Sequence, residues 1–376
     1  METPTTKGFA LLTSVVTGLL LTTTVAGAAA PAPIDWTETP TELGSAVLYT
    51  TERADGAQWS VGISLEQDGE ALRFHPLAAY WDGKAWRRTE SAVADGRLDD
   101  LLVRSRNDVW AVGATEGPTY GDRALLQRWN GKAWSRVTNP PELLEGSSQY
   151  TAVTAAGTGV LVGEAATDAE GNYQTAVRRY AGGKWTALPS AGLQHISYLD
   201  DLEQVSPKDV WAAGIGGVAR YDGKAWREVK LPIDMPADRQ FEIAQLVVRA
   251  ADDIWAVGEK PSEEYWRQPL ALHFDGKKWT EIAAPVRTGQ FHDLEFVDGR
   301  PVAVGGDPTT QEPIVAELSG GAFIETTTPP GAGYLHGSTV VGRCLWAVGV
   351  AAPGGTIEQP YVAVGTHQTG TPKPCR

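Results

Sequence analysis

The chain has 376 residues, of which 42% are hydrophobic and 21% are charged, a composition typical of folded proteins rather than disordered ones. Its formal net charge is −14 at pH 7. Nucleic acids and anionic membrane surfaces also carry negative charge, so this balance argues against binding to either. Neutral and cationic partners remain compatible with the chain.

Residues 1–28 are expected to form a cleaved secretory signal peptide. Lys7 provides a short positive segment, and the stretch 9–25 is apolar with Thr and Gly interspersed. Residues 26–28 read Ala-Gly-Ala, the small-x-small pattern that precedes a signal peptidase cut. The alternative is a retained membrane anchor, which the shortness of the apolar stretch disfavours. We therefore predict that residues 29–376 are secreted.

The chain has two cysteines, Cys344 and Cys375. An even number of cysteines in an exported chain predicts one disulfide bond, because the outside of the cell is oxidising. The alternative is a pair of unbonded thiols. Two cysteines without histidines at ligand spacing make a poor zinc site, so we expect no metal site and no cofactor.

A two-part phrase recurs along the rest of the chain. Its first part reads DVWAVG or a close variant, at Asp108–Gly113, Asp209–Gly214 and Asp253–Gly258. Its second part is an aromatic residue, a Gly-containing turn and Trp, as in the phrases that end at Trp134, Trp226 and Trp279. The glycines that close the first part recur about every 48 residues, at Gly62, Gly113, Gly163, Gly214, Gly258, Gly305 and Gly349.

A period of this length is typical of four-stranded propeller blades rather than helical solenoids. Within each unit, apolar runs of strand length alternate with Gly, Asp and Asn turns. We therefore predict an all-β fold, a seven-bladed β-propeller with four antiparallel strands in each blade. The predicted blades are 45–89, 98–138, 149–188, 198–230, 242–282, 291–325 and 334–366, followed by a tail, 367–376.

The seventh unit lacks an outer strand of its own. Residues 345–350 and 360–365 supply its second and third strands, but no Trp-containing phrase follows them. At the other end of the chain, residues 34–39 read IDWTET and resemble KKWTEI at 277–282. The N-terminal strand around Trp36 is therefore predicted to complete the last blade, which would remove an exposed sheet edge.

The units resemble kelch-type and related secreted bacterial propellers, in which an aromatic residue precedes a Trp across a short hairpin. They also resemble repeats that are common in exported actinobacterial proteins. The resemblance covers nearly the whole mature chain, although the double glycine of kelch repeats occurs at Gly305 and Gly306 and not in most units. It implies the propeller fold but no activity, because propellers host enzymes, lectins and scaffolds alike.

Candidate ligand-binding residues lie on loops that share one face of a propeller. Loops between the second and third strands are the most variable, and four of their aromatic residues are Tyr120, Tyr173, Tyr265 and Trp266. Such rings suit sugar faces and protein interfaces; the alternative is that they pack their own loops. The fourth unit nearly lacks this loop after Gly214, which predicts a notch beside the central pocket.

The segments that lead into the inner strands are rich in acids, histidines and tyrosines. One interpretation is a ring suited to acid–base catalysis or cation binding at the channel mouth. The other is that these side chains accept backbone N–H bonds at the crowded hub. Two LDDL phrases repeat at equivalent positions, which favours the second interpretation for their aspartates. The less regular residues are kept as ligand-binding candidates: His195, His292, His336 and Tyr198.

The sequence contains no GxSxG, P-loop, HExxH or dinucleotide-binding motif, so we predict no catalytic residue. The predicted function is a secreted, non-enzymatic module that binds an extracellular protein or glycan. Two alternatives stay open: a carbohydrate-active hydrolase or lyase with acids and histidines at the mouth, and a lectin-like or scaffold subunit of a larger secreted assembly. No nucleic-acid partner and no stable membrane insertion are expected.

Overall fold

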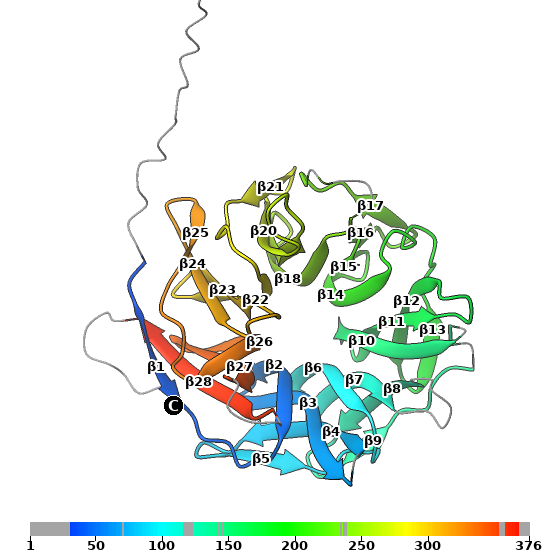
Figure 1. The fold of residues 1–376 in the computed structure, drawn as a ribbon. Helices are drawn as coiled ribbons and strands as arrows, with labels where there is room; N and C mark the ends of the chain where they lie inside the picture. The colour runs from blue at the N-terminus through cyan, green and yellow to red at the C-terminus, as the bar shows by residue number, and fades with distance from the viewer. Residues whose placement is uncertain are drawn as a thin grey trace, which may run out of the picture.

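The computed structural model describes residues 31–69, 71–115, 123–141, 143–144, 146–233, 235, 239–352 and 358–367. Across these residues the chain forms 28 strands and no helix. The strands make antiparallel sheets of four that stand around a central opening like the blades of a propeller (Figure 1). The fourth and fifth blades are joined into one sheet by a single residue pair, Ile215 with Glu242. The predicted seven-bladed fold is confirmed.

Within each blade the strands follow one another from the central opening outward. Blades 1 to 4 contain β2 (Ala46–Ala54), β3 (Ala57–Asp68), β4 (Ala71–Trp81) and β5 (Trp86–Thr89); β6 (Arg97–Ser105), β7 (Asp108–Thr115), β8 (Arg123–Trp129) and β9 (Trp134–Arg136); β10 (Ser147–Ala156), β11 (Gly159–Thr167), β12 (Tyr173–Ala181) and β13 (Lys184–Ala187); β14 (Tyr198–Ser206), β15 (Asp209–Ile215), β16 (Gly217–Tyr221) and β17 (Trp226–Val229).

The remaining blades follow the same plan, except that the last one takes its outer strand from the N-terminal end. Blades 5 to 7 contain β18 (Glu242–Ala250), β19 (Asp253–Lys260), β20 (Gln268–Phe274) and β21 (Trp279–Ile282); β22 (Gln290–Val297), β23 (Arg300–Gly306), β24 (Pro313–Ser319) and β25 (Ala322–Glu325); β26 (Ala332–Val341), β27 (Cys344–Ala351), β28 (Pro360–His367) and β1 (Ile34–Glu38).

The N-terminal strand closes the ring, as the sequence predicts. β1 pairs antiparallel with β28 and lies beside it in Figure 1. The indole Nε1 of Trp36 donates a hydrogen bond to the carbonyl oxygen of Thr327, 2.8 Å away, and the N–H of Ile34 donates to Thr327 Oγ1 at 2.9 Å. Ile34 is also buried against the last two blades. Hydrogen bonds and apolar burial together hold the two ends of the propeller.

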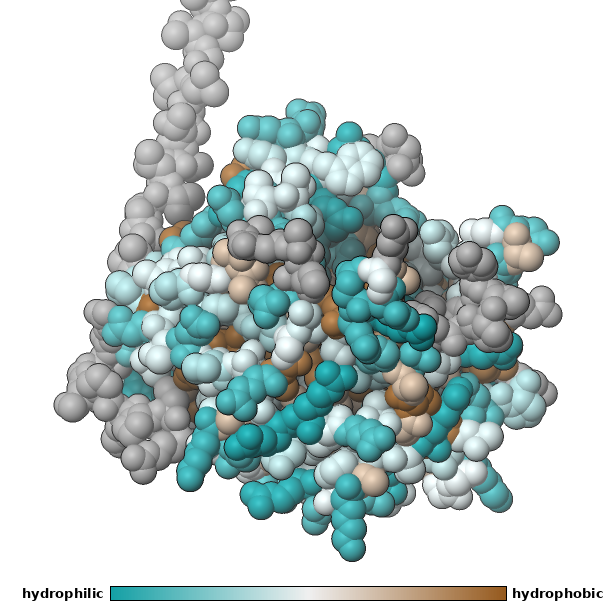
Figure 2. All heavy atoms as spheres, turned by 60° about the horizontal axis from the view of Figure 1, so that its bottom comes forward, coloured by the Kyte–Doolittle hydropathy of each residue, from teal (hydrophilic) through white to brown (hydrophobic). Residues whose placement is uncertain are grey.

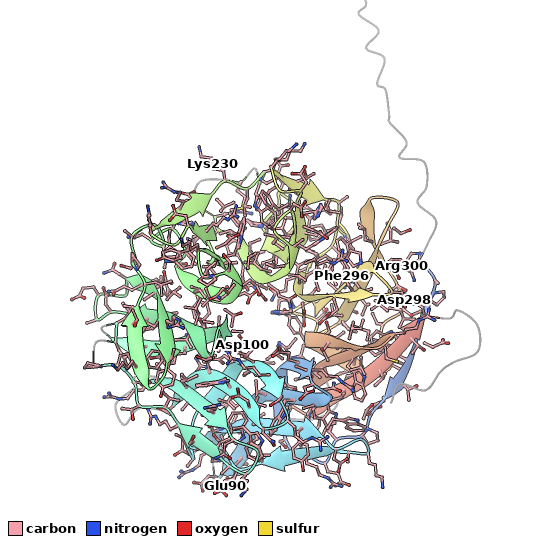
Figure 3. The ribbon with its side chains drawn as sticks, turned by 180° about the vertical axis from the view of Figure 1, so that it is seen from behind. Glu90, Asp100, Lys230, Phe296, Asp298 and Arg300 are labelled. Atoms are coloured by element: carbon pink, nitrogen blue, oxygen red, sulfur yellow. The ribbon has the colours of Figure 1, made fainter. Side chains whose placement is uncertain are left out.

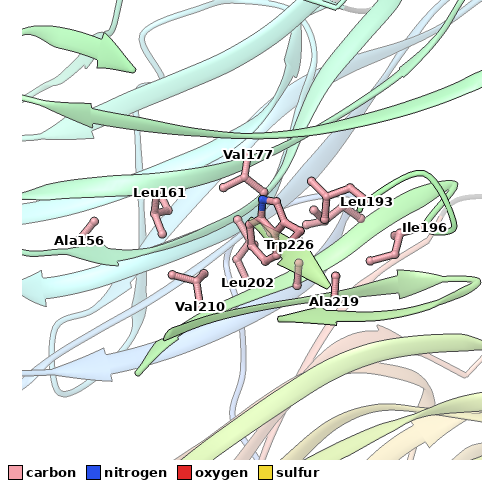
Figure 4. Close-up of a cluster of buried hydrophobic side chains, with 12 residues drawn as sticks. Ala156, Leu161, Val177, Leu193, Ile196, Leu202, Val210, Ala219 and Trp226 are labelled. Atoms are coloured by element: carbon pink, nitrogen blue, oxygen red, sulfur yellow. The ribbon is translucent and has the colours of Figure 1, made fainter. Parts of the chain in front are cut away.

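The repeated tryptophans explain the two-part phrase, because they meet across neighbouring blades. Trp59 of blade 1 packs against Trp134 of blade 2, with ring centroids 5.6 Å apart, and Trp211 of blade 4 packs against Trp279 of blade 5 at 5.9 Å. Blades 3 and 6 carry Leu161 and Val302 where the others carry Trp. Leu161 lies in the same buried cluster as Trp226 of blade 4 (Figure 4). Large flat rings fill the wedge between twisted blades.

Three predictions concern residues that the structure does not describe. The signal peptide 1–28, the tail residue Cys375 and the loop residue Tyr120 all lie outside the described ranges. Cys344 is buried at the start of β27. The disulfide, the cleavage site and a role for Tyr120 stay predictions. Over the ranges described above, no helix is long and apolar enough to cross a membrane.

Candidate functional site

A cavity of about 310 Å³ lies where the inner strands begin, and side chains from all seven blades line it. We call this cavity the central mouth. Most of its walls are acidic, aromatic or imidazole side chains, which come from β2, β6, β14, β18, β22 and β26. The cavity is at the small end of the range for ligand pockets, so it suits a side chain or small group rather than a folded domain.

Each inner strand carries a β-bulge near this cavity. In a regular strand successive side chains point to opposite faces, whereas a bulge re-aims one of them. Asp99 and Asp100 therefore both line the central mouth, as do Asp200 and Asp201. The repeated chemistry of the mouth follows from a backbone irregularity that occurs in every blade.

The deeper aspartate of each pair ties one blade to the next. Asp100 accepts a hydrogen bond from the N–H of Leu101 at 2.7 Å and one from Val153, in the inner strand of the following blade, at 2.8 Å. Asp201 and Asp293 bridge their own following blades in the same way. Figure 3 labels Asp100 beside the central opening. These carboxylates satisfy backbone donors of the hub and are committed to the fold.

A polar chain on the wall of blades 2 to 4 holds a further acid and a tyrosine. The Arg97 guanidinium donates to Asp99 at 2.9 Å and also to the side-chain oxygen of Gln149. Gln149 in turn donates to the hydroxyl of Tyr198 at 3.0 Å. Burial raises the pKa of Tyr198, so this phenol is neutral at pH 7. The wall is rigid and its charges are largely balanced.

Asp200 and Glu242 differ from these acids, because no described group donates a hydrogen bond to either carboxylate. The Oδ2 atom of Asp200 is shielded from solvent and has no partner. Burial, followed by the charge of Glu242, raises the pKa of Asp200 well above its usual range. Nearby Glu259 has a pKa raised to about 7 by burial, although Arg267 lies 3.0 Å away. Glu242 and Glu259 thus share the Arg267 guanidinium at this corner.

Two histidines and two tyrosines form the opposite wall. His292 Nε2 lies 2.6 Å from the Gln290 amide nitrogen and 2.7 Å from the Tyr334 hydroxyl; because an amide nitrogen can only donate, we assign Nε2 as the unprotonated acceptor of the Gln290 N–H. His336 packs between Tyr334 and Tyr49, with centroid distances of 4.9 and 5.6 Å. Burial lowers the pKa of His292 to about 3 and that of His336 to about 4. Both imidazoles are therefore uncharged at neutral pH.

A second cavity of about 490 Å³ lies over blades 4 and 5 and shares Glu242 with the central mouth. We call it the side pocket. It occupies the notch that the short fourth unit predicts, because β15 ends at Ile215 and β16 begins at Gly217. Trp266 stands at its rim and is 73% exposed, with the Arg239 guanidinium 5.4 Å from its ring centroid. The mouth and the side pocket are separate cavities that have Glu242 as a common lining residue.

The eight predicted ligand-binding residues divide into two groups. Four of them line the two cavities: Tyr198, His292, His336 and Trp266. Three others, Tyr265, Tyr173 and His195, line neither cavity. Tyr265 is fixed by its N–H to the hydroxyl of Ser262, Tyr173 is exposed at the start of β12, and His195 lies 3.2 Å from the carbonyl oxygen of Val218. Tyr120 is outside the described ranges.

The sequence analysis missed two residues of the mouth, Tyr49 and Glu242. Tyr49 occupies in blade 1 the bulge position that Asp99 and His292 occupy in theirs. Glu242 occupies in blade 5 the position of Tyr198 in blade 4. Both positions adjoin the inner-strand residue that pairs with the glycine of the recurring phrase: Glu242 precedes the partner of Gly258, and Tyr49 follows the partner of Gly62. An alignment of the units by their inner strands therefore identifies them.

A further cavity of about 690 Å³ lies at the outer edge of blade 1. Its polar side chains already have partners: His75 contacts the Ala94 carbonyl at 2.9 Å and Glu66 at 3.0 Å, and Arg88 donates to the Ser64 hydroxyl at 2.7 Å. The central mouth instead contains carboxylates without partners. We therefore assign the candidate site to the mouth and the side pocket.

The chemistry available at this site is recognition of polar and cationic groups. Its carboxylates attract cations, its neutral imidazoles accept hydrogen bonds, and its tyrosines offer ring faces. Within the described ranges, no three or more His, Cys, Asp and Glu side chains are placed to hold a metal ion.

Comparison with models of protein families finds no match, and comparison with curated protein sequences finds none either. Solved structures do match. YCF48 bound to D1 peptide is 14% identical with a TM-score of 0.55, over 90% of this chain and 99% of that one. The extracellular domain of BT4673 from B. thetaiotaomicron is 10% identical with a TM-score of 0.57, over 89% of this chain and 39% of that one.

A puromycin-hydrolyzing peptidase of Mycobacterium tuberculosis is 14% identical with a TM-score of 0.54, over 91% of this chain and 56% of that one. This chain therefore spans well under two thirds of the peptidase and of the BT4673 chain, but nearly all of YCF48. At such low identity the likeness concerns the fold alone. The chain shares the β-propeller fold with these proteins.

Proposed function

We propose that this protein is a secreted binding module that holds a peptide segment of an extracellular partner across the central mouth and the side pocket. The observation that carries the proposal is that Glu242 lines both cavities while the exposed Trp266 lines the second one. A rigid platform with unequal loops on one face is a common arrangement for binding sites. Exposed Trp side chains beside a pocket are typical anchors of protein interfaces.

Trp266 is unusual on this surface. On the side of the molecule shown in Figure 2, hydrophilic residues dominate and apolar ones are scattered among them. Among the described residues the large hydrophobics that are exposed number four: Leu72, Tyr173, Trp266 and Val286. Of these, only Trp266 lines either of the two cavities of the candidate site. A docking peptide would cover the exposed Trp266 ring and the neighbouring polar groups that have no partner.

Charge favours a peptide over a glycan as the occupant. The acids of the mouth outnumber its cations, and many secreted glycans are neutral or acidic. The likeness to YCF48, whose structure contains a bound D1 peptide, is compatible with peptide binding on this fold. Glycan binding, and a role as one subunit of a larger secreted assembly, are outcomes that the experiment below separates from it.

A hydrolase is the second candidate, and Asp200 with Glu242 carries it. Buried carboxylates with raised pKa values are the groups that glycosidases use as proton donors. Binding without turnover fits the site better, because His292 and His336 are uncharged and packed by aromatic rings. The puromycin-hydrolyzing peptidase extends well beyond the part that resembles this chain, so its activity does not transfer.

Three further properties belong to the proposal. The leader is removed after Ala28, the tail is fastened by a disulfide between Cys344 and Cys375, and the repeat is of the kelch-like kind found in exported bacterial proteins. Each rests on the residues quoted above: the Ala-Gly-Ala pattern, the even cysteine count and the recurring DVWAVG phrase.

The test is selection of ligands by the secreted protein from a displayed peptide library, with a glycan array in parallel. Trp266→Ala should weaken the selected peptides by about tenfold or more, since a central aromatic anchor carries roughly 2 kcal/mol. Tyr173→Ala is the matched control, because this ring is 65% exposed and lines neither cavity. Peptides that bind both variants as well as the parent would refute the site. Selective glycan capture or substrate cleavage would support an alternative.

A further inference from the structure

The corner of the central mouth that adjoins the side pocket holds more carboxyl groups than cations. Asp200 and Glu242 both line the mouth, and no described group donates a hydrogen bond to either carboxylate. The nearest guanidinium, Arg267, is already bonded to Glu259 at 3.0 Å and to Gln290 at 2.7 Å. A carboxylate oxygen that is shielded from water and lacks a partner is costly, which makes the Oδ2 atom of Asp200 notable.

The neighbouring side chains of the mouth supply no additional cation to Asp200 and Glu242. The deeper acids Asp201 and Asp293 turn to backbone N–H groups of the next blade, and they add negative charge below the corner. The Arg97 guanidinium is engaged by Asp99 and Gln149 on the far side of Tyr198. A group that brings positive charge into the corner from outside would therefore gain attraction without displacing an existing bond.

Aromatic rings line the same cavity, and Tyr198 is the one that lies near Asp200 and Glu242. Tyr49 and Tyr198 line the same cavity, and both phenols are neutral because burial raises their pKa values, that of Tyr49 to about 12. A ring face attracts a cation in addition to a nearby carboxylate, as in pockets that hold ammonium groups. The neutral His336 ring lies edge to face against Tyr49 and adds no repelling charge. Carboxylates and ring faces together select a cation that is partly apolar.

We propose that the central mouth takes a lysine or arginine side chain of the bound peptide, whose charged head pairs with Asp200 and Glu242 while its stem runs in from the side pocket beside Trp266. This inference rests on the proposed function and names the ligand chemistry of the same site. Glu242 lines both the mouth and the side pocket, so it adjoins the two parts of the proposed site.

The experiment measures binding of three capped amino acids to the full secreted protein by ligand-observed NMR: N-acetyl-lysine, N-acetyl-arginine and N-acetyl-norleucine methylamides. Norleucine keeps the stem and removes the charge. The parent protein should bind at least one cationic probe about tenfold or more tightly than the norleucine probe, as expected for charge-assisted bonds. Asp200→Asn and Glu242→Gln, which keep shape and remove charge, should each abolish that preference.

Glu228→Gln is the matched control, because it makes the same change on the exposed surface of the outer strand β17 and should leave the preference intact. If Asp200→Asn fails to fold, Glu242→Gln alone decides. Equal binding of charged and uncharged probes would overturn the inference, and so would a preference that survives both substitutions. The two proposals can fail separately. Peptides that bind through Trp266 but contain no basic residue would support the proposed peptide-binding function and refute only the inference that the mouth takes a lysine or arginine side chain.

Discussion

A Cβ atom at Gly258 would lie 2.0 Å from the carbonyl oxygen of Glu242 on the adjoining inner strand. The equivalent glycines of five other blades would meet an inner-strand carbonyl in the same way, at 2.2 Å or less. In blade 3 a Cβ at Gly163 would instead meet the tip of the Leu199 side chain at 2.5 Å. In six of the seven blades the glycine that closes the phrase therefore makes room for the bulge that aims side chains into the mouth, whereas in blade 3 Glu164 takes the corresponding position opposite Tyr150.

Gly258→Ala should lower the free energy of unfolding by about 3 kcal/mol, because the added methyl group collides with backbone that has no rotamer to change. Gly163→Ala should cost clearly less, since the Leu199 side chain can turn aside. Urea unfolding followed by tryptophan fluorescence measures both. An equal loss for the two variants would contradict the link between this glycine and the bulge.

The bridge between blades 4 and 5 gives a second prediction. Asp201 accepts hydrogen bonds from the N–H of Leu202 at 2.7 Å and of Leu246 at 2.6 Å. Asp201→Ala leaves both donors unpaired and should cost about 2 kcal/mol of stability. Asp222→Ala is the control, because this exposed aspartate also accepts two N–H bonds, but within a single hairpin of blade 4. A larger loss for Asp222→Ala would show that the hub bridges contribute little.

Closure by the N-terminal strand gives a third prediction. Deleting residues 29–40 removes the pairing of β1 with β28 and exposes the apolar surface that Ile34 covers. The melting temperature should therefore fall by on the order of 10 °C. Thr327→Val is a milder test, since it removes the two hydrogen bonds between Thr327 Oγ1 and the backbone of Ile34 and should cause a smaller fall. Calorimetry measures both; an unchanged melting temperature in the deletion variant would refute the role of β1.

The predicted bond between Cys344 and Cys375 is testable by thiol labelling under denaturing conditions. We expect no labelled cysteine before reduction and two after it. Closing a loop of this length contributes about 3–4 kcal/mol in the chain-entropy view, so reduction should lower the melting temperature. Reducing agent should have no effect on a Cys375→Ser variant, and label incorporated into the unreduced parent would exclude the bond.

The fold could be predicted from the sequence because its decisive features are periodic. The phrase that ends at Gly113 returns in later units, and the pairing of Trp59 with Trp134 shows why Trp recurs on two strands. The missing outer strand of the last unit pointed to Trp36, because a blade without a fourth strand leaves an unpaired edge. Periodicity also explained the second aspartate of each LDDL phrase, Asp100 and Asp201, as an acceptor of backbone N–H bonds, but not the first, Asp99 and Asp200.

The site was predicted less completely, because it depends on where the bulges turn the chain and on contacts between blades. Alternation along a strand puts Asp99 and Asp100 on opposite faces, whereas the bulge brings both to the mouth. Nothing in the sequence indicates that Tyr150, near the start of an inner strand, is fully buried and stacked on Trp185. The path from Arg267 through Gln290 to His292 joins two blades and has no sequence pattern.

The acids of the channel give a prediction about pH. Burial raises the pKa of Glu295 to about 8 and that of Glu52 to about 7, whereas backbone N–H groups and Arg87 lower that of the exposed turn residue Asp82 to about 2. A raised folded-state pKa gives stability that is complete below pH 4.5 and lost as pH rises towards 8; a lowered one gives stability that is lost below pH 3.8. Stability should therefore peak near pH 4–5 and decline to pH 8.

Glu295→Gln should raise the melting temperature at pH 8 by several degrees and leave it unchanged at pH 4, because it removes the charge that burial and Asp293 oppose. Scanning calorimetry across this range would refute the idea if the parent were most stable at pH 8.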